Sequence, residues 1–343
     1  MIGRVIALGQ IEGREVAALM VDGLIEDLAM ETDALGTGAI LRGVVGRPVK
    51  GLGGVFVDLP DGQSGFLRAP KGLAPGQRIL VQIAGAAEPG KALPLTQRLL
   101  FKSRYAIVTP DAPGLNVSRA IHDEDIRAEL TALAGAAMAG ASETLGLILR
   151  SVCEQASDED VTQDIAQMRA LAEAVLADLT GGPELLVDAP GPHELAWRDW
   201  GDADEVDDSA EALDHSGALD QIEALHRGEV KLDGGASMWI QATRAFVAVD
   251  VNTGADTSPA AGLKASIAAA RDLPRQLRLR GMGGMIIVDF APCPKRDRHV
   301  LEQVLSKAFR ADAGEATMAG WTPLGNFELT RRRDRAPLAG WPV

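Results

Sequence analysis

Two apolar segments, each ending at an aspartate, constrain the fold of this 343-residue chain more than any other feature. Residues Ser237 to Val251 predict one long strand with Asp250 near its end, and the apolar run Met285–Val288 predicts a second strand that stops at Asp289. A helical pattern from Ala261 to Arg280 lies between them. In a strand–helix–strand unit the two strands run parallel and end at the same sheet edge, so we expect the two aspartates to meet.

The two aspartates are candidate metal ligands. Two carboxylates at one sheet edge repel each other unless a cation lies between them, and carboxylate oxygens favour Mg²⁺ or Mn²⁺. Such a cation can polarise a phosphodiester and activate water. Asn252, in the sequence AVDVNTG, is neutral and suits a hydrogen bond to a phosphate oxygen. The residues alone leave a second interpretation open, in which acids at strand ends act as helix caps or turn formers.

The segments before this unit predict a chain of several domains. Residues 4–30 alternate apolar and polar side chains around two glycine-containing turns, which is typical of a three-stranded meander. Short strands separated by glycine and proline between residues 39 and 99 predict a small closed barrel of the OB type. Apolar residues at helical spacing predict helices near 123–139 and 162–179. The acidic stretch 199–214 predicts a solvated loop outside the core.

Charge is distributed unevenly along the chain. The net charge of −14 argues against a nucleic-acid partner, but eight acids without a base fall between Asp199 and Asp214. From Arg271 onward, 13 lysines and arginines stand against 8 acids. Because the local field decides where a phosphate backbone docks, RNA binding stays possible. Arg275, Arg278 and Arg280 predict either a phosphate-contacting stripe or a solvated basic face.

Cysteine usage and hydropathy predict a cytoplasmic protein. Cys153 and Cys293 lie far apart without CxxC partners, so we expect packing residues in a reducing compartment and no zinc site. No apolar run is long enough to span a membrane, and the N-terminus lacks signal-peptide features, so we expect no membrane partner.

Several motifs together resemble the ribonuclease E/G family: AVDVNTG, RQLRLRGMGGMIIVDF and NFELTRRR near the C-terminus, with EVAALMVDGLIEDLAMET, GGVFVDLPDGQSGFL, GLNVSRAI, GLILRSV and HRGEVKLDGGAS before them. The resemblance implies an α/β, multidomain (α+β) fold in which a ribonuclease-H-like layer is interrupted by other domains. Its parts would be the first ribonuclease-H-like part (1–36), an S1 barrel (37–100), a 5′-sensor-like region (101–182), the second ribonuclease-H-like part with the acidic loop 199–214 (183–228), and a DNase-I-like catalytic α/β domain (229–343).

The resemblance also implies roles for individual residues. Asp250 and Asp289 would be the Mg²⁺ ligands, with Mn²⁺ as a possible substitute, and Asn252 would hold the scissile phosphate. Phe56 and Phe66 would clamp RNA bases, since aromatic faces on an OB barrel stack bases without requiring one sequence. The alternative for both phenylalanines is ordinary barrel core. The remaining residues implied are Lys91 for RNA contact and Arg150 with Ser151 for binding a 5′-monophosphate.

Four departures from the family pattern affect regulation and assembly. Serine replaces threonine at position 151, and Glu315 aligns with a basic residue of the family's sensor, which would repel a phosphate. Pro274 stands where the family has an uninterrupted helix, and we expect it to break or kink the helix. The CPxC zinc-link motif is absent, so we expect no structural zinc and, if a homodimer forms, no zinc bridge.

The sequence predicts a Mg²⁺-dependent endoribonuclease that hydrolyses single-stranded, A/U-rich RNA in RNA processing or decay, leaving a 5′-phosphate and a 3′-hydroxyl. The alternative is a non-catalytic S1-type RNA-binding protein on the same scaffold. A third possibility is a phosphatase or DNA nuclease that uses the same two carboxylates.

Overall fold

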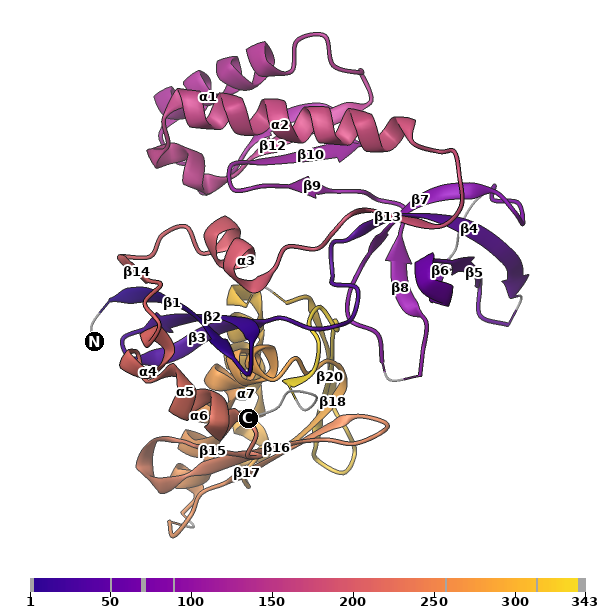
Figure 1. Ribbon diagram of the computed structural model, residues 1–343. Coiled ribbons are helices and arrows are strands. Elements are labelled where there is room, and N and C mark those ends of the chain that lie inside the picture. Colours follow the sequence, from indigo (N-terminus) through magenta and orange to yellow (C-terminus); the bar gives the residue numbers. More distant parts are fainter. Residues whose placement is uncertain are drawn as a thin grey trace. The chain divides into compact units, whose positions relative to one another are not determined.

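The computed structural model describes residues 3–49, 51–68, 72–88, 90–256, 258–312 and 314–338 (Figure 1). The chain forms two compact units. One unit combines Met1–Gly13, Ala18–Leu28 and Asp207–Val343, and the other combines Arg14–Ala17 and Ala29–Val206. Over the described residues, every helix is too short or too polar to cross a membrane.

The first strands form the predicted meander. They belong to a four-stranded sheet of order β14-β1-β2-β3, with bounds β1 (Arg4–Ile11), β2 (Arg14–Val21), β3 (Leu24–Met30) and β14 (Glu205–Asp207). Glu12-Gly13 and Asp22-Gly23 connect the strands, and all four residues have positive φ angles, between 49° and 81°. Two consecutive residues in this conformation match the right-handed twist of a tight hairpin, which explains glycine at the second position.

A closed five-stranded barrel follows, consistent with an S1 or OB fold. Its strands pair in the order β4-β5-β6-β8-β7, and the pairing of β4 with β7 closes the sheet, while β13 extends it beside β4. The bounds are β4 (Ile40–Val49), β5 (Gly54–Asp58), β6 (Ser64–Arg68), β7 (Arg78–Ile83), β8 (Leu93–Thr96) and β13 (Glu184–Val187). The barrel interior is apolar, and Leu41, Val57 and Val81 are fully buried there.

The next region packs two helices against a small sheet of order β11-β12-β10-β9. Its elements are β9 (Phe101–Lys102), β10 (Ala106–Pro110), β11 (Gly114–Val117), α1 (Glu124–Ala137), β12 (Leu145–Leu149) and α2 (Asp158–Ala177). Figure 1 shows α2 lying along β10, and α2 also contacts β9. Both helices begin at a capping side chain. Asp123 accepts from the backbone N–H groups of Asp125 and Ile126 at the start of α1, and Ser157 accepts from the N–H of Asp160 at the start of α2.

The acidic stretch 199–214 contributes to the folded structure, and the prediction of a solvated loop was wrong. It begins at the end of α3 (Pro192–Asp199), contains β14, and runs into α4 (Ala212–His215), where Ala212 and Leu213 are buried. Helix α5 (Ala218–Leu225) follows. Six of the eight acids in this stretch are exposed, while Asp199 and Asp207 are partly buried. A count of charges alone therefore hid the secondary structure.

The last third of the chain forms a six-stranded sheet of order β15-β16-β17-β18-β20-β19. Its elements are β15 (Glu229–Lys231), β16 (Ser237–Ala242), β17 (Val247–Asn252), α6 (Pro259–Leu279), β18 (Gly284–Asp289), α7 (Arg298–Ala311), β19 (Ala316–Trp321) and β20 (Phe327–Arg331). Strands β17 and β18 are parallel neighbours joined through α6, as the sequence predicted.

The predicted long strand 237–251 is in fact a hairpin, so that expectation was wrong. Strands β16 and β17 are antiparallel, and the chain reverses between them over residues 243–246. The Thr243 hydroxyl accepts hydrogen bonds from the backbone N–H groups of Ala245 and Phe246, and this side chain closes the turn. The apolar alternation on both sides of Thr243 concealed the reversal.

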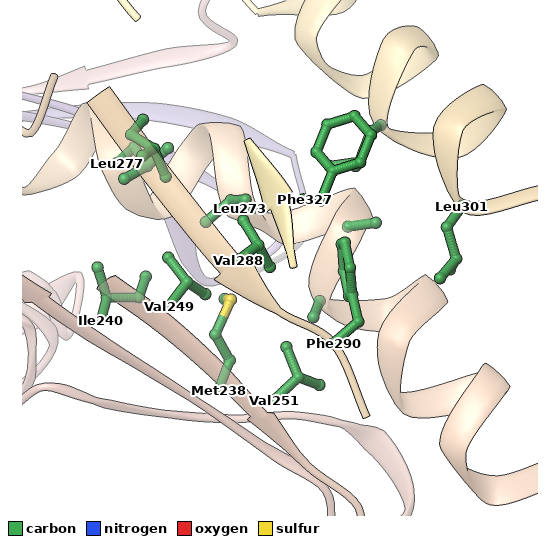
Figure 2. Close-up of a cluster of buried hydrophobic side chains, with 14 of the residues drawn as sticks. Met238, Ile240, Val249, Val251, Leu273, Leu277, Val288, Phe290, Leu301 and Phe327 are labelled. Carbon is green, nitrogen blue, oxygen red and sulfur yellow. The ribbon is translucent and has the colours of Figure 1, made fainter. Parts of the chain in front are cut away.

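Helices α6 and α7 cover one face of this sheet. Figure 2 shows Leu273 and Leu277 of α6 among Val249 and Val288 of the central strands, and all four side chains are at most 2% exposed. Helix α6 is continuous through Pro274, so the predicted break does not occur. Burial of the leucines on either side of the proline offsets the hydrogen bond that its ring nitrogen cannot donate.

Candidate active site

The two aspartates lie side by side on neighbouring strands. Asp250 of β17 and Asp289 of β18 are register partners in the parallel pair. Adjacent strands are separated by about 4.8 Å, and paired residues point to the same face of a sheet. The side chains therefore emerge next to each other, at the edge where we expected them.

The alternation of side chains along β17 and β18 determines which face of the sheet the two aspartates occupy. Val249 and Val251 flank Asp250, Val288 precedes Asp289, and all three valines are buried against the helices. Both aspartates are exposed. The apolar face therefore anchors the strands, and the opposite face presents the carboxylates to solvent.

Asn252 lies two residues further along β17 on the same face and is exposed. Its amide Nδ2 donates a hydrogen bond of 2.7 Å to Oδ2 of Asp250. An amide nitrogen carries two N–H groups, so the second is available to a phosphate oxygen. The same bond orients the Asp250 carboxylate.

The loop after Asn252 is held by close backbone packing. Gly254 has φ +68°, and a Cβ atom there would lie 2.4 Å from the carbonyl oxygen of Gly235. Only glycine fits this approach, so the NTG sequence fixes the chain against the turn that leads into β16. Ser258 then caps α6 by accepting from the N–H of Ala261.

The donor set of the pair fits Mg²⁺ or Mn²⁺. Within the described part of the chain, no ion pair joins a lysine or arginine to either carboxylate, and no group of three or more potential ligand side chains gathers anywhere. Mg²⁺ is commonly held by one or two carboxylates together with water and substrate phosphate, so two aligned aspartates with open surroundings are sufficient.

Two features beside the aspartates were not predicted from the sequence. Trp239 of β16 is the register partner of Asp250 and is 41% exposed. On the other side, a hollow of about 560 Å³ opens beside Ile287 and Glu328, which are register partners on β18 and β20. The position of Trp239 follows from the hairpin, so the assumption of one long strand hid it.

The predicted RNA-contacting residues of the barrel are two phenylalanines and a lysine. Phe56 and Phe66 are register partners on β5 and β6, with ring centroids 5.4 Å apart in an edge-to-face arrangement. Phe56 is 37% exposed between the buried Val55 and Val57, so it lies outside the barrel core. Lys91, at the start of the segment that forms β8, is well exposed and pairs with Glu88 at 2.7 Å.

Arg150 is engaged within the chain. One guanidinium nitrogen donates to the carbonyls of Ser103, Arg104 and Arg198, at 2.7 to 3.1 Å, and the other pairs with Asp199 at 2.9 Å. Ser151 follows it and is exposed. The contacts show Arg150 tying three segments together, while its proposed role toward a 5′-phosphate stays a prediction.

Asp199 is the centre of this cluster. Lys102 and Arg198 pair with it as well, at 2.8 Å and 2.9 Å. Burial by itself would raise the pKa of Asp199, but hydrogen bonds and charges from Arg198 and Lys102 outweigh burial and hold the pKa at about 2. Burial lowers the pKa of Lys102 despite its bond to Asp199. We call Lys102, Arg150, Arg198 and Asp199 the Asp199 cluster.

The arginines of α6 are not arranged as an exposed stripe. Arg278 and Arg280 are 7% and 3% exposed. Arg278 pairs with Glu26 and Asp312, and Arg275 donates to the carbonyl oxygen of Ile25 at 2.6 Å. Neither arginine is available to an RNA backbone in this conformation. Arg278 packs α6 against the first strands of the same unit, and Arg280 donates to Gln276 of its own helix and to the carbonyl oxygen of Arg227. The sequence could not show this, since Glu26 lies 252 residues before Arg278 and Asp312 lies 34 residues after it.

Comparison with known proteins gives a consistent result. The model of the "Ribonuclease E/G family" matches residues 101–208 and 202–334. A ribonuclease E of Nostoc is 29% identical over 379 residues, which is 94% of this chain and 55% of that protein. A ribonuclease G of Salmonella typhimurium is 27% identical over 386 residues, covering 91% of this chain and 76% of that protein. The chain thus spans about half the length of the ribonuclease E relatives it matches. Since the family model covers more than half of the chain, this protein belongs to the ribonuclease E/G family.

Proposed function

We propose that this protein is a Mg²⁺-dependent endoribonuclease that hydrolyses single-stranded RNA, with a preference for A/U-rich segments. The observation that carries the proposal is the register of Asp250 with Asp289 on adjacent parallel strands. Family membership and the names of the relatives, ribonuclease E and ribonuclease G, support the same reaction class.

The residues divide the chemistry between them. Asp250 and Asp289 would hold the metal, and a bound Mg²⁺ supplies Lewis-acid polarisation of the phosphodiester and a water of lowered pKa. Asn252 positions the scissile phosphate through its free amide N–H and keeps the Asp250 carboxylate oriented. Lys231 contributes a positive charge, because it is exposed and shares a register row with Ser237 and Asn252 on the same sheet face.

The barrel would supply sequence-tolerant affinity. An exposed phenylalanine stacks on any nucleobase, so Phe56 suits single strands, whose bases are free, better than duplexes. An exposed aromatic side chain on an OB-type barrel therefore favours RNA over a phosphomonoester substrate. We propose a cytoplasmic location for such an enzyme, and no zinc bridge in any dimer.

The direct test is cleavage of a 5′-labelled, A/U-rich single-stranded RNA by the purified protein. We expect cleavage with Mg²⁺, none with EDTA, and a loss of at least about a thousand-fold for Asp250→Asn with RNA binding retained. A DNA oligonucleotide of the same sequence and a phosphomonoester serve as parallel substrates. Near wild-type cleavage by Asp250→Asn in Mg²⁺ would contradict the proposal.

The second candidate is a protein that binds RNA through the barrel without cutting it. The edge-to-face pair of the exposed Phe56 with the partly buried Phe66 favours this function independently of the aspartates. Wild-type protein that binds the RNA with and without EDTA, and never cleaves it, would establish this candidate instead.

A further inference from the structure

Trp239 occupies an unusual position in the catalytic sheet. Four register partners form one row across four strands: Glu229 on β15, Trp239 on β16, Asp250 on β17 and Asp289 on β18. Register partners share a face, so the indole emerges on the face that carries the two carboxylates, directly beside Asp250.

The environment of Trp239 differs from that of a core aromatic side chain. Its neighbours along β16, Met238 and Ile240, are 0% and 2% exposed, whereas Trp239 is 41% exposed. A Cβ atom built on Gly228 would lie 3.4 Å from Cε3 of Trp239, so the ring passes over a glycine that leaves it room. On a row whose other members are carboxylates, this ring is the only apolar surface, and its exposed part is open to a stacking partner.

The two sides of the aspartate pair are therefore different. On the β16 side stands an exposed ring, and on the β20 side lies the hollow beside Ile287 and Glu328. A nucleic-acid strand whose phosphate sits at Asp250 and Asp289 places a flanking base within reach of each side. An indole offers the largest stacking surface of any side chain, and base stacking requires no particular base.

We propose that Trp239 is a base-stacking residue that holds the nucleotide on one side of the scissile phosphate. This inference rests on the proposed function for the location of the phosphate, and it adds a determinant of substrate position within the catalytic sheet. Trp239 acts by fixing the RNA backbone over the carboxylates, and it takes no part in proton transfer or metal binding. Single-stranded RNA is the substrate class it selects, because a base in a duplex is already stacked on both faces.

The experiment compares Trp239→Ala, Trp239→Phe and Met285→Ala with the wild type. Met285 is a matched control, because it lies on the same sheet face and is 46% exposed, but sits four residues before Asp289 on β18. We expect Trp239→Ala to lower kcat/KM for a single-stranded oligonucleotide by about 5- to 150-fold, Trp239→Phe to restore most of the loss, and Met285→Ala to have little effect. Circular dichroism and thermal unfolding check that each variant folds.

An abasic scan identifies the stacked nucleotide. Oligonucleotides carry one abasic site at each of the two positions on either side of the cleavage site. We expect one of these sites to lower wild-type kcat/KM as strongly as Trp239→Ala does, and to cause no further loss in that variant. Equal losses for wild type and Trp239→Ala at every position would overturn the inference.

A binding measurement tests the stacking role of Trp239 separately from the proposed cleavage reaction. In the Asp250→Asn background, with no cleavage possible, Trp239→Ala should weaken the Kd for the same oligonucleotide by a similar factor. If the wild type fails to cleave but Trp239→Ala still weakens binding, the proposed reaction fails and the stacking role stands. If cleavage proceeds normally and Trp239→Ala matches the wild type in both assays, the stacking role fails alone.

Discussion

Two clusters of charged side chains, one in each compact unit, are built on opposite principles. Asp250 and Asp289 bring like charges together on an exposed sheet face, and no described cation pairs with either. The Asp199 cluster brings three cations onto one carboxylate, with all its contacts inside the chain. Like charges placed together cost stability until a ligand compensates them, whereas opposite charges contribute stability without one. The comparison predicts opposite effects for the same substitution, aspartate to asparagine, at the two places.

The largest expected effect is on cleavage. Asp289→Asn should lower kcat for single-stranded RNA by at least about a thousand-fold, because one of two proposed metal ligands is lost. In metal-free buffer the same substitution should raise the free energy of unfolding by about 0.3–1 kcal/mol, since it removes repulsion with Asp250. Kinetics and urea unfolding in EDTA measure the two quantities. An Asp289→Asn variant that is both active and less stable than the wild type would contradict both expectations.

Asp199→Asn should have the opposite effects: it should lower the stability of the fold and leave RNA cleavage nearly unchanged. Loss of the carboxylate leaves Lys102, Arg150 and Arg198 facing one another, so we expect the free energy of unfolding to fall by about 1–3 kcal/mol. Cleavage of RNA per folded molecule should stay within a few-fold of the wild type. Asp208→Asn is a suitable control, because Asp208 lies in the same acidic stretch and is exposed. An unchanged urea midpoint for Asp199→Asn would show that the cluster contributes no stability.

The pH dependence of stability gives a finer test of the Asp199 cluster. The folded pKa of Asp199, about 2, lies below the ordinary value of 3.8. A lowered carboxyl pKa contributes stability that is fully present above the unfolded pKa and is lost as the pH falls through the folded pKa. The difference in unfolding free energy between wild type and Asp199→Asn should therefore be constant above about pH 5 and shrink between about pH 4 and pH 2. A difference that grows on acidification would have the wrong sign.

A smaller effect is expected in the barrel, for which we propose a role in RNA affinity and none in the chemistry. Phe56→Ala should weaken binding of single-stranded RNA by about 5- to 150-fold, while kcat at saturating RNA changes little. Leu115→Ala provides a control, since Leu115 is 41% exposed in the same unit but outside the barrel. Fluorescence anisotropy with a labelled oligonucleotide measures the affinities. Equal losses for Phe56→Ala and Leu115→Ala would argue against a specific role for the barrel face.

The sequence predicted local features and their direct consequences well. Alternation and tight-turn residues predicted the meander, and closely spaced short strands predicted the barrel. The order strand, helix, strand was enough to bring Asp250 and Asp289 to one sheet edge. Each of these inferences depends on neighbours within about forty residues and on the handedness and connection rules of sheets.

The features it could not predict depend on distant partners. Arg278 looked like part of a solvated stripe, but Glu26 and Asp312 draw it into the packing of α6. Asp199 looked like one acid among eight, and its role became visible only with Lys102 and Arg150 beside it. Apolar alternation on both sides of a turn has the same pattern as one long strand, so the sequence did not predict the hairpin at Thr243. The position of Trp239 beside Asp250 follows from this hairpin and was therefore also missed.

The most direct test of the central claim is the position of a bound metal. Crystals of the protein soaked in Mn²⁺ should show an anomalous difference peak between the carboxylates of Asp250 and Asp289, within about 2.0–2.3 Å of an oxygen of each. The same soak of Asp289→Asn crystals should show no peak there. A peak elsewhere on the molecule, with these two carboxylates empty at saturating Mn²⁺, would contradict the assignment of the active site.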